Sequence, residues 1–207
     1  MSAGSVVAGI AVSRETMERL EKFASLLIKW NPAINLVARS TIEDLWERHL
    51  VDSVQLARFL EHQPESWLDL GSGGGLPGLV LSIVASEKSP ETKFDLVDSD
   101  QRKCTFLRQA VRELGLQNAR IHSARIEDLQ PMAADVVSAR ALSSLSVLCG
   151  YAAKHLARNG FGIFPKGASF LNEVQEARLK WRFHIEEIES MTNKDARLLK
   201  LSAIEHV

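Results

Sequence analysis

The residues best suited to chemistry form a D-x-G-x-G-x-G pattern, in which Asp69 is followed by Gly71, Gly73 and Gly75. An apolar run precedes the glycines and another follows them, which predicts a strand, a turn and a helix in that order. Open parallel sheets bind ligands at such turns, where glycine lets a ligand approach the backbone without an intervening Cβ. We therefore predict a ligand-binding loop made of Asp69 and these three glycines.

The spacing and the charge of this loop restrict the ligand. A dinucleotide fingerprint needs a glycine where this chain has Leu76, and the Asp69 carboxylate would repel a pyrophosphate but suits a cation or an ammonium. Asp98 ends the next predicted strand, about twenty residues further on, where a carboxylate can accept both hydroxyls of a ribose. A nucleoside with an amino acid and a positive centre fits, which describes S-adenosylmethionine. The competing interpretations are a plain tight loop for the glycines and a helix cap for Asp98.

The elements that must position these residues alternate between short apolar runs and longer helical patterns, which is typical of an α/β fold with a doubly wound, mostly parallel sheet. Two strand-like runs near the C-terminus, "WRFHIEEIES" and "ARLLKLSAIE", lie too close together for a helical crossover and predict an antiparallel hairpin at the end of the sheet. The predicted strands are 67–70, 93–98, 119–122, 135–139 and 161–165, and the predicted helices are 76 onward, 101–114, 143–156 and 169–179.

Residues 1–62 predict an N-terminal helical subdomain, and residues 63–207 the ligand-binding domain, within one compact unit. Apolar residues recur at helical spacing from Ser13 to Trp30, and Pro32 is expected to break this helix. Thr41 with Asp44 resembles a capping box that opens a second helix. His49 falls on the apolar face of that helix, where a hydrogen-bonded core histidine is expected.

Composition excludes several classes of protein. Of 207 residues, 45% are hydrophobic and 25% charged, which is ordinary for a globular protein. No run approaches the roughly 20 apolar residues of a membrane helix, and the first residues lack the charge of a secretory signal, so we expect a cytoplasmic protein without a membrane partner. Cys104 and Cys149 have no metal-ligand spacing, and we expect two core thiols and no metal.

Several motifs occur in a characteristic order: "LLIKWNPAINLVARS", "RHLVDS", "LDLGSGGGLPG", "LVDSDQRKCTFL", "SARIED", "VVSARAL" and "FPKG". With them the chain resembles, from about Leu20 to Lys166, the bacterial small-subunit ribosomal RNA guanine-N7 methyltransferases, also called glucose-inhibited division protein B. The resemblance implies a class I (Rossmann-like) methyltransferase fold. It also implies S-adenosylmethionine as methyl donor, S-adenosylhomocysteine as product, and N7 of guanine 527 in 16S ribosomal RNA of the small ribosomal subunit as target. We expect a monomer.

The resemblance also implies which residues contact the donor. They are Gly71, Leu76, Ile126, Glu127 and Arg140, with Asp98 near the ribose.

Guanine N7 presents a lone pair, so it needs no base to remove a proton before it attacks a sulfonium methyl. We therefore assign no catalytic nucleophile, and expect the rate to come from placement. Arg140 and Lys166 end two predicted strands at the ligand edge and are the expected positioning residues. Arg140 suits a carboxylate or the Hoogsteen edge of guanine, and Lys166 suits a phosphate. The competing interpretations are a surface arginine and a solvated lysine.

The sequence leaves other functions open, because a donor-binding motif says nothing about the acceptor. These are a methyltransferase for a protein or a small molecule, a module that senses S-adenosylmethionine without turnover, and a nicotinamide dehydrogenase. For an RNA acceptor, the N7 edge of an A-form helix lies in a groove too deep and narrow for proteins. We therefore expect the target in a loop, a bulge or a partly assembled particle.

Overall fold

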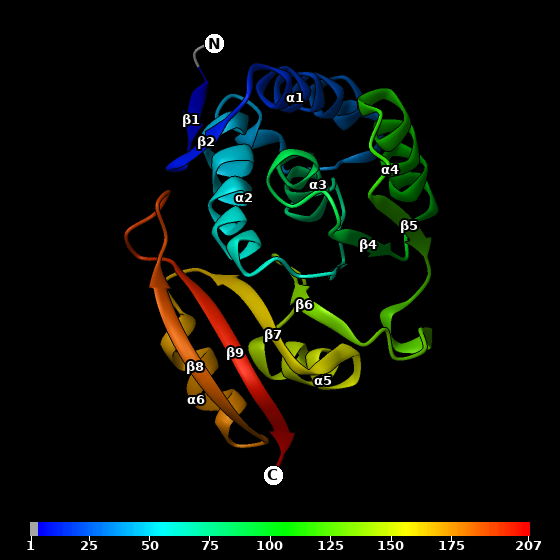
Figure 1. Ribbon diagram of the computed structural model, residues 1–207. Helices are drawn as coiled ribbons and strands as arrows, with labels where there is room; N and C mark the ends of the chain where they lie inside the picture. The colour runs from blue at the N-terminus through cyan, green and yellow to red at the C-terminus, as the bar shows by residue number, and fades with distance from the viewer. Residues whose placement is uncertain (1–3) are drawn as a thin grey trace.

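The computed structural model describes residues 4–207, and a seven-stranded sheet forms its centre (Figure 1). The strand order is β5-β4-β3-β6-β7-β9-β8; the first five strands are parallel, and β9 is antiparallel to both of its neighbours. The strands are β3 (Ser66–Leu70), β4 (Lys93–Asp98), β5 (Ala119–Ser123), β6 (Ala134–Ser138), β7 (Leu156–Lys166), β8 (Trp181–Glu189) and β9 (Arg197–His206).

The doubly wound, mostly parallel sheet predicted from the sequence is confirmed. β3 lies between β4 and β6, so the chain reverses its direction across the sheet at β3, and ligands bind at such a switch point in open α/β sheets. The predicted C-terminal hairpin is also confirmed, but its second strand, β9, inserts between β7 and β8. Burial explains this order, because Leu198, Leu199 and Leu201 of β9 are buried while β8 alternates between half-buried and exposed positions, as an edge strand does.

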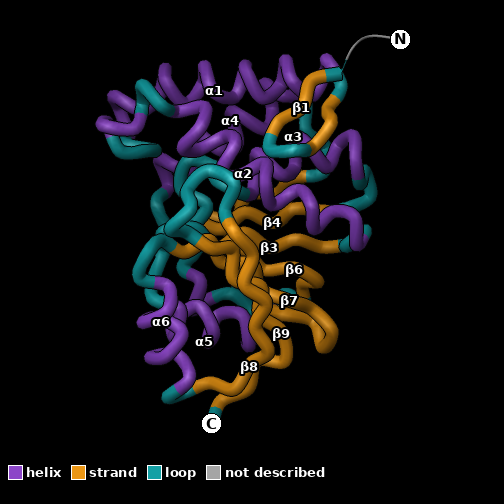
Figure 2. Tube along the Cα trace, turned by 90° about the vertical axis from the view of Figure 1, so that its left-hand side faces the viewer, coloured by secondary structure: helices purple, strands orange, loops and turns teal. Residues whose placement is uncertain are grey.

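Helices cover both faces of the sheet (Figures 1 and 2). One apolar cluster joins α1, α3 and α4 to one face through Trp67 and Phe94, and a second joins α5 and α6 to the other face through Leu68 and Leu70. The helices are α1 (Arg14–Ile34), α3 (Gly78–Lys88), α4 (Gln101–Leu114), α5 (Leu145–His155) and α6 (Phe170–Arg178).

The N-terminal part differs from the prediction in two places. A short hairpin, β1 (Ser5–Val7) with β2 (Ile10–Val12), precedes α1. In addition, α1 continues through Pro32, so the predicted break there is wrong. Pro32 has no N–H to donate to the carbonyl oxygen of Ile28. Both residues are exposed, so water can hydrogen-bond to that carbonyl instead. The helix instead ends at Asn35, which has φ 48° and donates its N–H to Asn31 O at 3.0 Å.

The second helical segment, residues 46–62, is irregular. It consists of a π-helix (Trp46–Val51), a short α2 (Asp52–Val54) and a 3-10 helix (Gln55–His62). The predicted capping box is wrong, because Thr41 closes a separate 3-10 turn (Arg39–Thr41) by donating its hydroxyl to Ala38 O at 2.7 Å. Thr41 Oγ1 also lies 2.7 Å from His49 Nε2.

The N-terminal helices share one core with the sheet. Phe23 of α1 is fully buried, and it belongs to the same apolar cluster as Leu50 and Leu60 of segment 46–62 and Trp67 of β3. A boundary near residue 62 is therefore not a boundary between two apolar cores.

We predict that Phe23→Ala lowers the free energy of unfolding of the whole chain by about 3–5 kcal/mol, because it leaves a cavity in this shared core. Ile28→Ala on the same helix removes a side chain that is 49% exposed, and should change the stability by less than about 0.5 kcal/mol. Urea unfolding followed by far-UV circular dichroism, together with hydrogen exchange in β3 and β4, measures both. If Phe23→Ala released only α1 and left exchange in β3 and β4 unchanged, the shared core would be disproved.

Candidate functional site

The glycine-rich turn connects β3 to α3, as predicted. Gly71, Gly73 and Gly75 all have positive φ, at 65°, 54° and 85°. A Cβ on Gly71 would lie 2.5 Å from Leu142 Cδ1, and one on Gly75 would lie 2.9 Å from Leu79 Cβ in the core. At Gly73 the nearest atom would be a backbone oxygen 3.8 Å away. The structure therefore gives the protein's own packing as the reason for Gly71 and Gly75, and only Gly73 presents its bare Cα to open space.

Asp69 lies beneath this turn and is fully buried. Its carboxylate accepts hydrogen bonds from Ser138 Oγ at 2.6 Å and from Gly78 N at 3.2 Å, and its backbone oxygen accepts one from Ser72 Oγ at 3.0 Å. Burial raises the pKa of Asp69 to about 6, and these donors oppose the rise. Asp69 thus holds β3, β6 and the first turn of α3 together, and its carboxylate does not face an open site.

Asp98 at the end of β4 faces the same turn. It accepts the N–H of Gly73 at 2.8 Å through Oδ2 and the N–H of Asp100 at 2.8 Å through Oδ1. Asp98 does not cap α4, since Asp100 does so by accepting from Arg102 N at 2.8 Å. Asp98 and Gly73 are therefore in direct contact, as their predicted common site requires.

The remaining predicted donor residues lie around this edge. Leu76 is 5% exposed and precedes α3, and Ile126 is 8% exposed in a short 3-10 helix (Ile126–Asp128) after β5. Glu127 is exposed, and a hydrogen bond from the Tyr151 hydroxyl lowers the pKa of its carboxyl. These three residues lie outside the large cavity at the ends of β6 and β7. Asp69, Gly73 and Asp98 also lie outside it.

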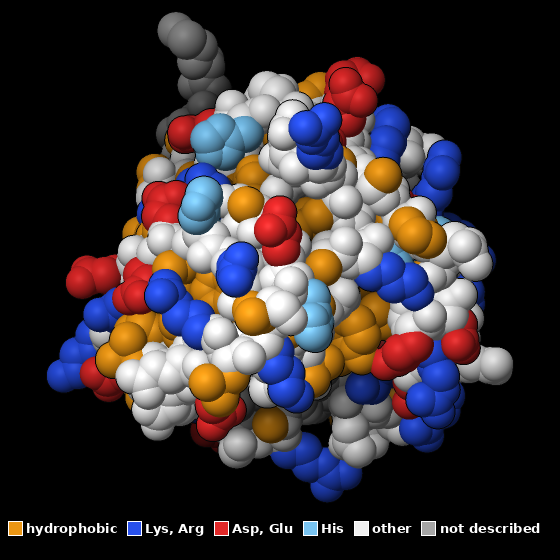
Figure 3. Space-filling model, turned by 90° about the horizontal axis from the view of Figure 1, so that it is seen from below, with side chains coloured by type: hydrophobic (Ala, Val, Ile, Leu, Met, Phe, Trp, Pro, Cys, Tyr) orange, Lys and Arg blue, Asp and Glu red, His pale blue; other side chains and the backbone are white. Residues whose placement is uncertain are grey.

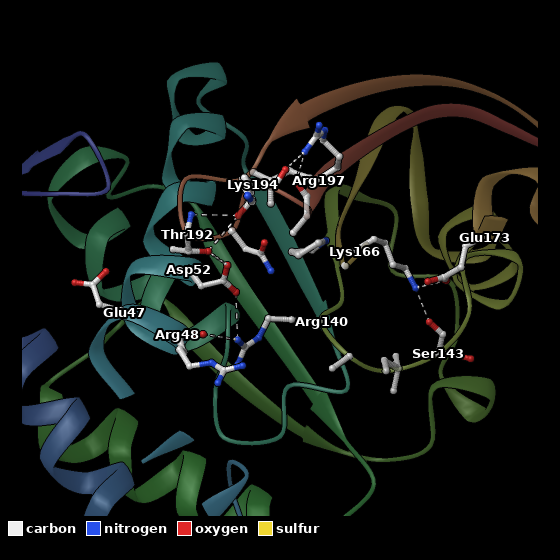
Figure 4. Close-up of a pocket in the computed structure, with 18 of the residues that line it drawn as sticks. Glu47, Arg48, Asp52, Arg140, Ser143, Lys166, Glu173, Thr192, Lys194 and Arg197 are labelled. Atoms are coloured by element: carbon white, nitrogen blue, oxygen red, sulfur yellow. Dashed lines mark hydrogen bonds and ion pairs between the residues drawn. The ribbon is translucent and has the colours of Figure 1, made fainter. Parts of the chain in front are cut away.

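A cavity of about 1210 Å³ opens beyond the carboxyl ends of β6 and β7 (Figure 4). Four segments form its walls: helical segment 46–62, the β6–α5 loop, the end of β7 with α6, and the β8–β9 turn. Leu142 borders the cavity and also packs on Gly71, so the cavity adjoins the glycine turn. The charged side chains that line it are Glu47, Arg48, Asp52, Arg140, Lys166, Glu173, Lys194 and Arg197.

Arg140 follows β6 and lines this cavity. Its Nη1 donates to Asp52 Oδ2 at 3.3 Å and to Arg48 O at 3.4 Å, and its Nη2 lies 3.0 Å from His49 Nδ1. The side chain of Arg140 is only 18% exposed. The structure therefore excludes a merely solvated surface arginine.

The contact with Arg140 fixes the tautomer of His49. Arginine only donates, so His49 Nδ1 must accept, and the ring proton must be on Nε2, where it is donated to Thr41 Oγ1 at 2.7 Å. Burial, followed by the charge of Arg140, lowers the pKa of His49 to about 4. His49 is thus hydrogen-bonded as expected, but it lies half-buried beside the cavity.

Lys166 lies across the cavity from Arg140 (Figure 4). Its Nζ donates to Glu173 Oε2 and to Ser143 O, both at 2.7 Å, and its side chain is 10% exposed. It is therefore an ion-paired, mostly buried lysine and not a solvated one.

The structure thus divides the predicted residues into two neighbouring groups. The glycine turn, Leu76, Asp98, Ile126 and Glu127 lie along the ends of β3, β4 and β5, whereas Arg140 and Lys166 lie at the ends of β6 and β7. Sequence reasoning missed Asp52 and the β8–β9 turn, which complete the cavity. Asp52 lies inside the quoted motif "RHLVDS", but nothing in that motif indicates its partners.

Other surfaces carry mixed charge. Lys and Arg side chains are interspersed with Asp and Glu on the face shown in Figure 3. Cys104 and Cys149 are buried and free, as expected. Within residues 4–207, no helix combines the length and apolarity needed to span a membrane, and no cluster of His, Cys, Asp and Glu has the arrangement of a metal site.

Comparison with known proteins defines the class. A solved S-adenosylmethionine-dependent methyltransferase from Aquifex aeolicus superimposes with a TM-score of 0.55 over 87% of this chain and 97% of that chain, at 14% identity. That likeness concerns the fold alone. With the sheet order and the glycine turn after β3, it defines a class I, Rossmann-like methyltransferase fold.

Sequence relatives define the family. A Cereibacter sphaeroides protein named Ribosomal RNA small subunit methyltransferase G is 53% identical over 207 residues, and a Ruegeria sp. protein of that name is 50% identical over 209, each covering 100% of both chains. The family model GidB, rRNA small subunit methyltransferase G, matches residues 16–201. The chain belongs to this rRNA small subunit methyltransferase G family.

We predict that Arg140→Ala raises the pKa of His49 from about 4 toward its ordinary value of 6.5, because the variant removes an adjacent positive charge. Arg48→Ala should raise the pKa less, and Asp52→Asn should lower it, since Asp52 opposes the shift. Two-dimensional ¹H–¹⁵N spectra of the imidazole, recorded from pH 7 to 3.5, measure the pKa and the Nε2–H tautomer. A wild-type ring protonated on Nδ1 at pH 7 would contradict the Arg140 contact.

Proposed function

We propose that this protein transfers a methyl group from S-adenosylmethionine to N7 of guanine 527 in 16S ribosomal RNA of the small subunit. One observation carries the proposal: the glycine turn with its open Gly73, and the cavity lined by Arg140, adjoin each other across Leu142 at the switch point of the sheet. Family membership supports ribosomal RNA as the acceptor.

The residues around the glycine turn fit the donor. Gly73 leaves open the space that a Cβ would fill, and the Asp98 carboxylate beside it is suited to ribose hydroxyls. Leu76 and Ile126 offer apolar surface to an adenine, and Glu127 offers a further carboxylate. Gly71, Gly75 and Asp69 contribute by shaping the turn. When bound, S-adenosylmethionine supplies an electrophilic methyl group on a sulfonium.

Arg140 and the cavity fit the acceptor. Guanine N7 brings its own lone pair, so the chain has no proton to remove, and its task is to hold the base at a fixed distance and angle. Three of the five N–H groups of Arg140 are engaged by Asp52, Arg48 and His49. Within residues 4–207 the other two have no partner, and they suit the donor's carboxylate or guanine O6. Lys166 bonds Glu173 and Ser143, and these contacts hold in place the cavity wall that faces Arg140.

The volume and charge of the cavity support a nucleotide acceptor. At about 1210 Å³ it exceeds the usual size of a small-molecule pocket, so it has room for a nucleotide together with part of the chain that carries it. The N7 edge is not accessible within an A-form helix, so the base must be unpaired or turned out of its stack.

The function is tested by transferring the methyl group in vitro. We expect purified protein, S-adenosylmethionine and small subunits from a strain that lacks this methyltransferase to give one N7-methylguanosine per 16S RNA, located at position 527 by mass spectrometry of nuclease fragments. Protein-free duplex RNA of the same sequence should react far more slowly. Equal rates on both, or no N7-methylguanosine in either, would disprove the proposal.

The donor site is tested by a matched pair of glycine substitutions. Gly73 and Gly115 both have positive φ, at 54° and 66°, and a Cβ at either position has no close contact, so Ala introduces similar backbone strain. We predict that Gly73→Ala weakens S-adenosylmethionine binding about tenfold or more, whereas Gly115→Ala, at the end of α4, leaves the affinity unchanged. Calorimetry measures both, and equal affinities would place the donor elsewhere.

A further inference from the structure

Asp52 is the one cavity-lining carboxylate, among those described, that contacts three separate segments of the chain. Oδ2 accepts from Arg140 Nη1 at 3.3 Å, and Oδ1 accepts from Thr192 Oγ1 at 2.8 Å (Figure 4). Oδ1 also accepts from Gln55 Nε2 at 2.9 Å. These donors belong to the β6–α5 loop, the β8–β9 turn and helical segment 46–62. Three of the four cavity walls therefore meet at this carboxylate.

Gln55 strengthens the same junction. It is 1% exposed, and besides bonding Asp52 it donates to Ser190 Oγ at 3.3 Å and accepts from Met191 N at 2.9 Å. The β8–β9 turn is thus fastened to segment 46–62 by side chains of Asp52 and Gln55. The same turn carries Lys194 at the cavity.

A carboxylate inside a cavity for a polyanion requires a reason, because it repels phosphate. Asp52 is offset by the charge of Arg140 and by two neutral donors, and its side chain is 20% exposed. Its geometry therefore suits holding protein groups in place and not contacting the RNA.

We propose that Asp52 is a positioning residue for methyl transfer: it orients the guanidinium of Arg140 over the acceptor cavity and fixes the β8–β9 turn as the adjoining wall. The inference rests on the proposed function. It assigns a separate task to each carboxylate oxygen. Oδ2 holds Arg140 near the reacting base, and Oδ1 holds the β8–β9 turn, which faces the rest of the RNA.

Steady-state kinetics on small subunits test this division. We expect Asp52→Asn to lower kcat on the order of tenfold to a hundredfold, because Arg140 loses its anionic partner and shifts. Its affinity for S-adenosylmethionine should stay within about twofold of wild type, since this inference directs Arg140 to the guanine and the variant touches no residue of the glycine turn. Thr192→Val, nearly the same shape, releases only the turn and should raise KM for the subunit with kcat retained.

Glu47→Gln is the matched control for charge. Glu47 lines the same cavity, and within residues 4–207 its side chain has no hydrogen-bond partner, so the variant removes one negative charge without releasing a wall. We expect it to lower KM for the subunit, the opposite of Thr192→Val. If Asp52→Asn behaved like Glu47→Gln, Asp52 would act through its charge alone and the proposal would be overturned.

A double-mutant cycle decides whether Asp52 acts through Arg140. In an Arg140→Lys background, Asp52→Asn should lower kcat by much less than in wild type. Additive losses of kcat would overturn the proposal. It would also be overturned if urea unfolding showed that Asp52→Asn loses folded protein in the same proportion as it loses kcat. Wild-type methylation at guanine 527 with an additive cycle would refute only the role of Asp52, whereas absent wild-type methylation would refute the proposed function itself.

Discussion

The architecture of the ligand edge depends on one buried carboxylate. Asp69 lies one residue before the end of β3 and is fully buried, and it is stabilised in that position by Ser138 of β6 and by the first N–H of α3. A Cβ on Gly78 would lie 2.6 Å from the same carboxylate, so α3 can approach β3 this closely only because residue 78 is a glycine. Ser138 in turn accepts the indole N–H of Trp67 at 2.9 Å. These contacts join β3, β6 and the start of α3 at the switch point, directly beneath the glycine turn.

On this base, the two neighbouring sites are built by different means. The proposed donor side is made of local backbone geometry, namely positive φ angles and the contact between Gly73 and Asp98. The proposed acceptor side is made of long-range side-chain contacts between Arg140, Asp52, His49 and Thr192. Leu142 joins the two sides, since it covers Gly71 and borders the cavity. The N-terminal helices and the C-terminal hairpin thus complete a site that the central strands alone leave open.

The same difference explains what the sequence could predict. The bounds of α4 agree with the prediction because Asp100 and Gly115 are local signals for its two ends. Arg140 and Lys166 were found because strand ends meet at one edge of a parallel sheet. Asp52 could not be found, since its bond to Thr192 joins residues 140 positions apart. Segment 46–62 is helical, as predicted, but its π and 3-10 turns were not predicted, because they follow from packing and from the bonds of His49 and Gln55, which a helical period does not encode.

The charge of the cavity resolves the conflict between a net charge of −1 and an RNA partner. Five basic and three acidic side chains line the cavity, and two of the acids, Asp52 and Glu173, are paired with Arg140 and Lys166. These pairs keep their cations oriented and largely dehydrated, whereas Arg48, Lys194 and Arg197 outnumber the one remaining acid, Glu47, and leave an excess of positive charge. Phosphates respond to the electrostatic potential within about one Debye length, roughly 8–10 Å. The attraction of RNA to the cavity is therefore set by the local excess of positive charge and not by the charge of the distant surface.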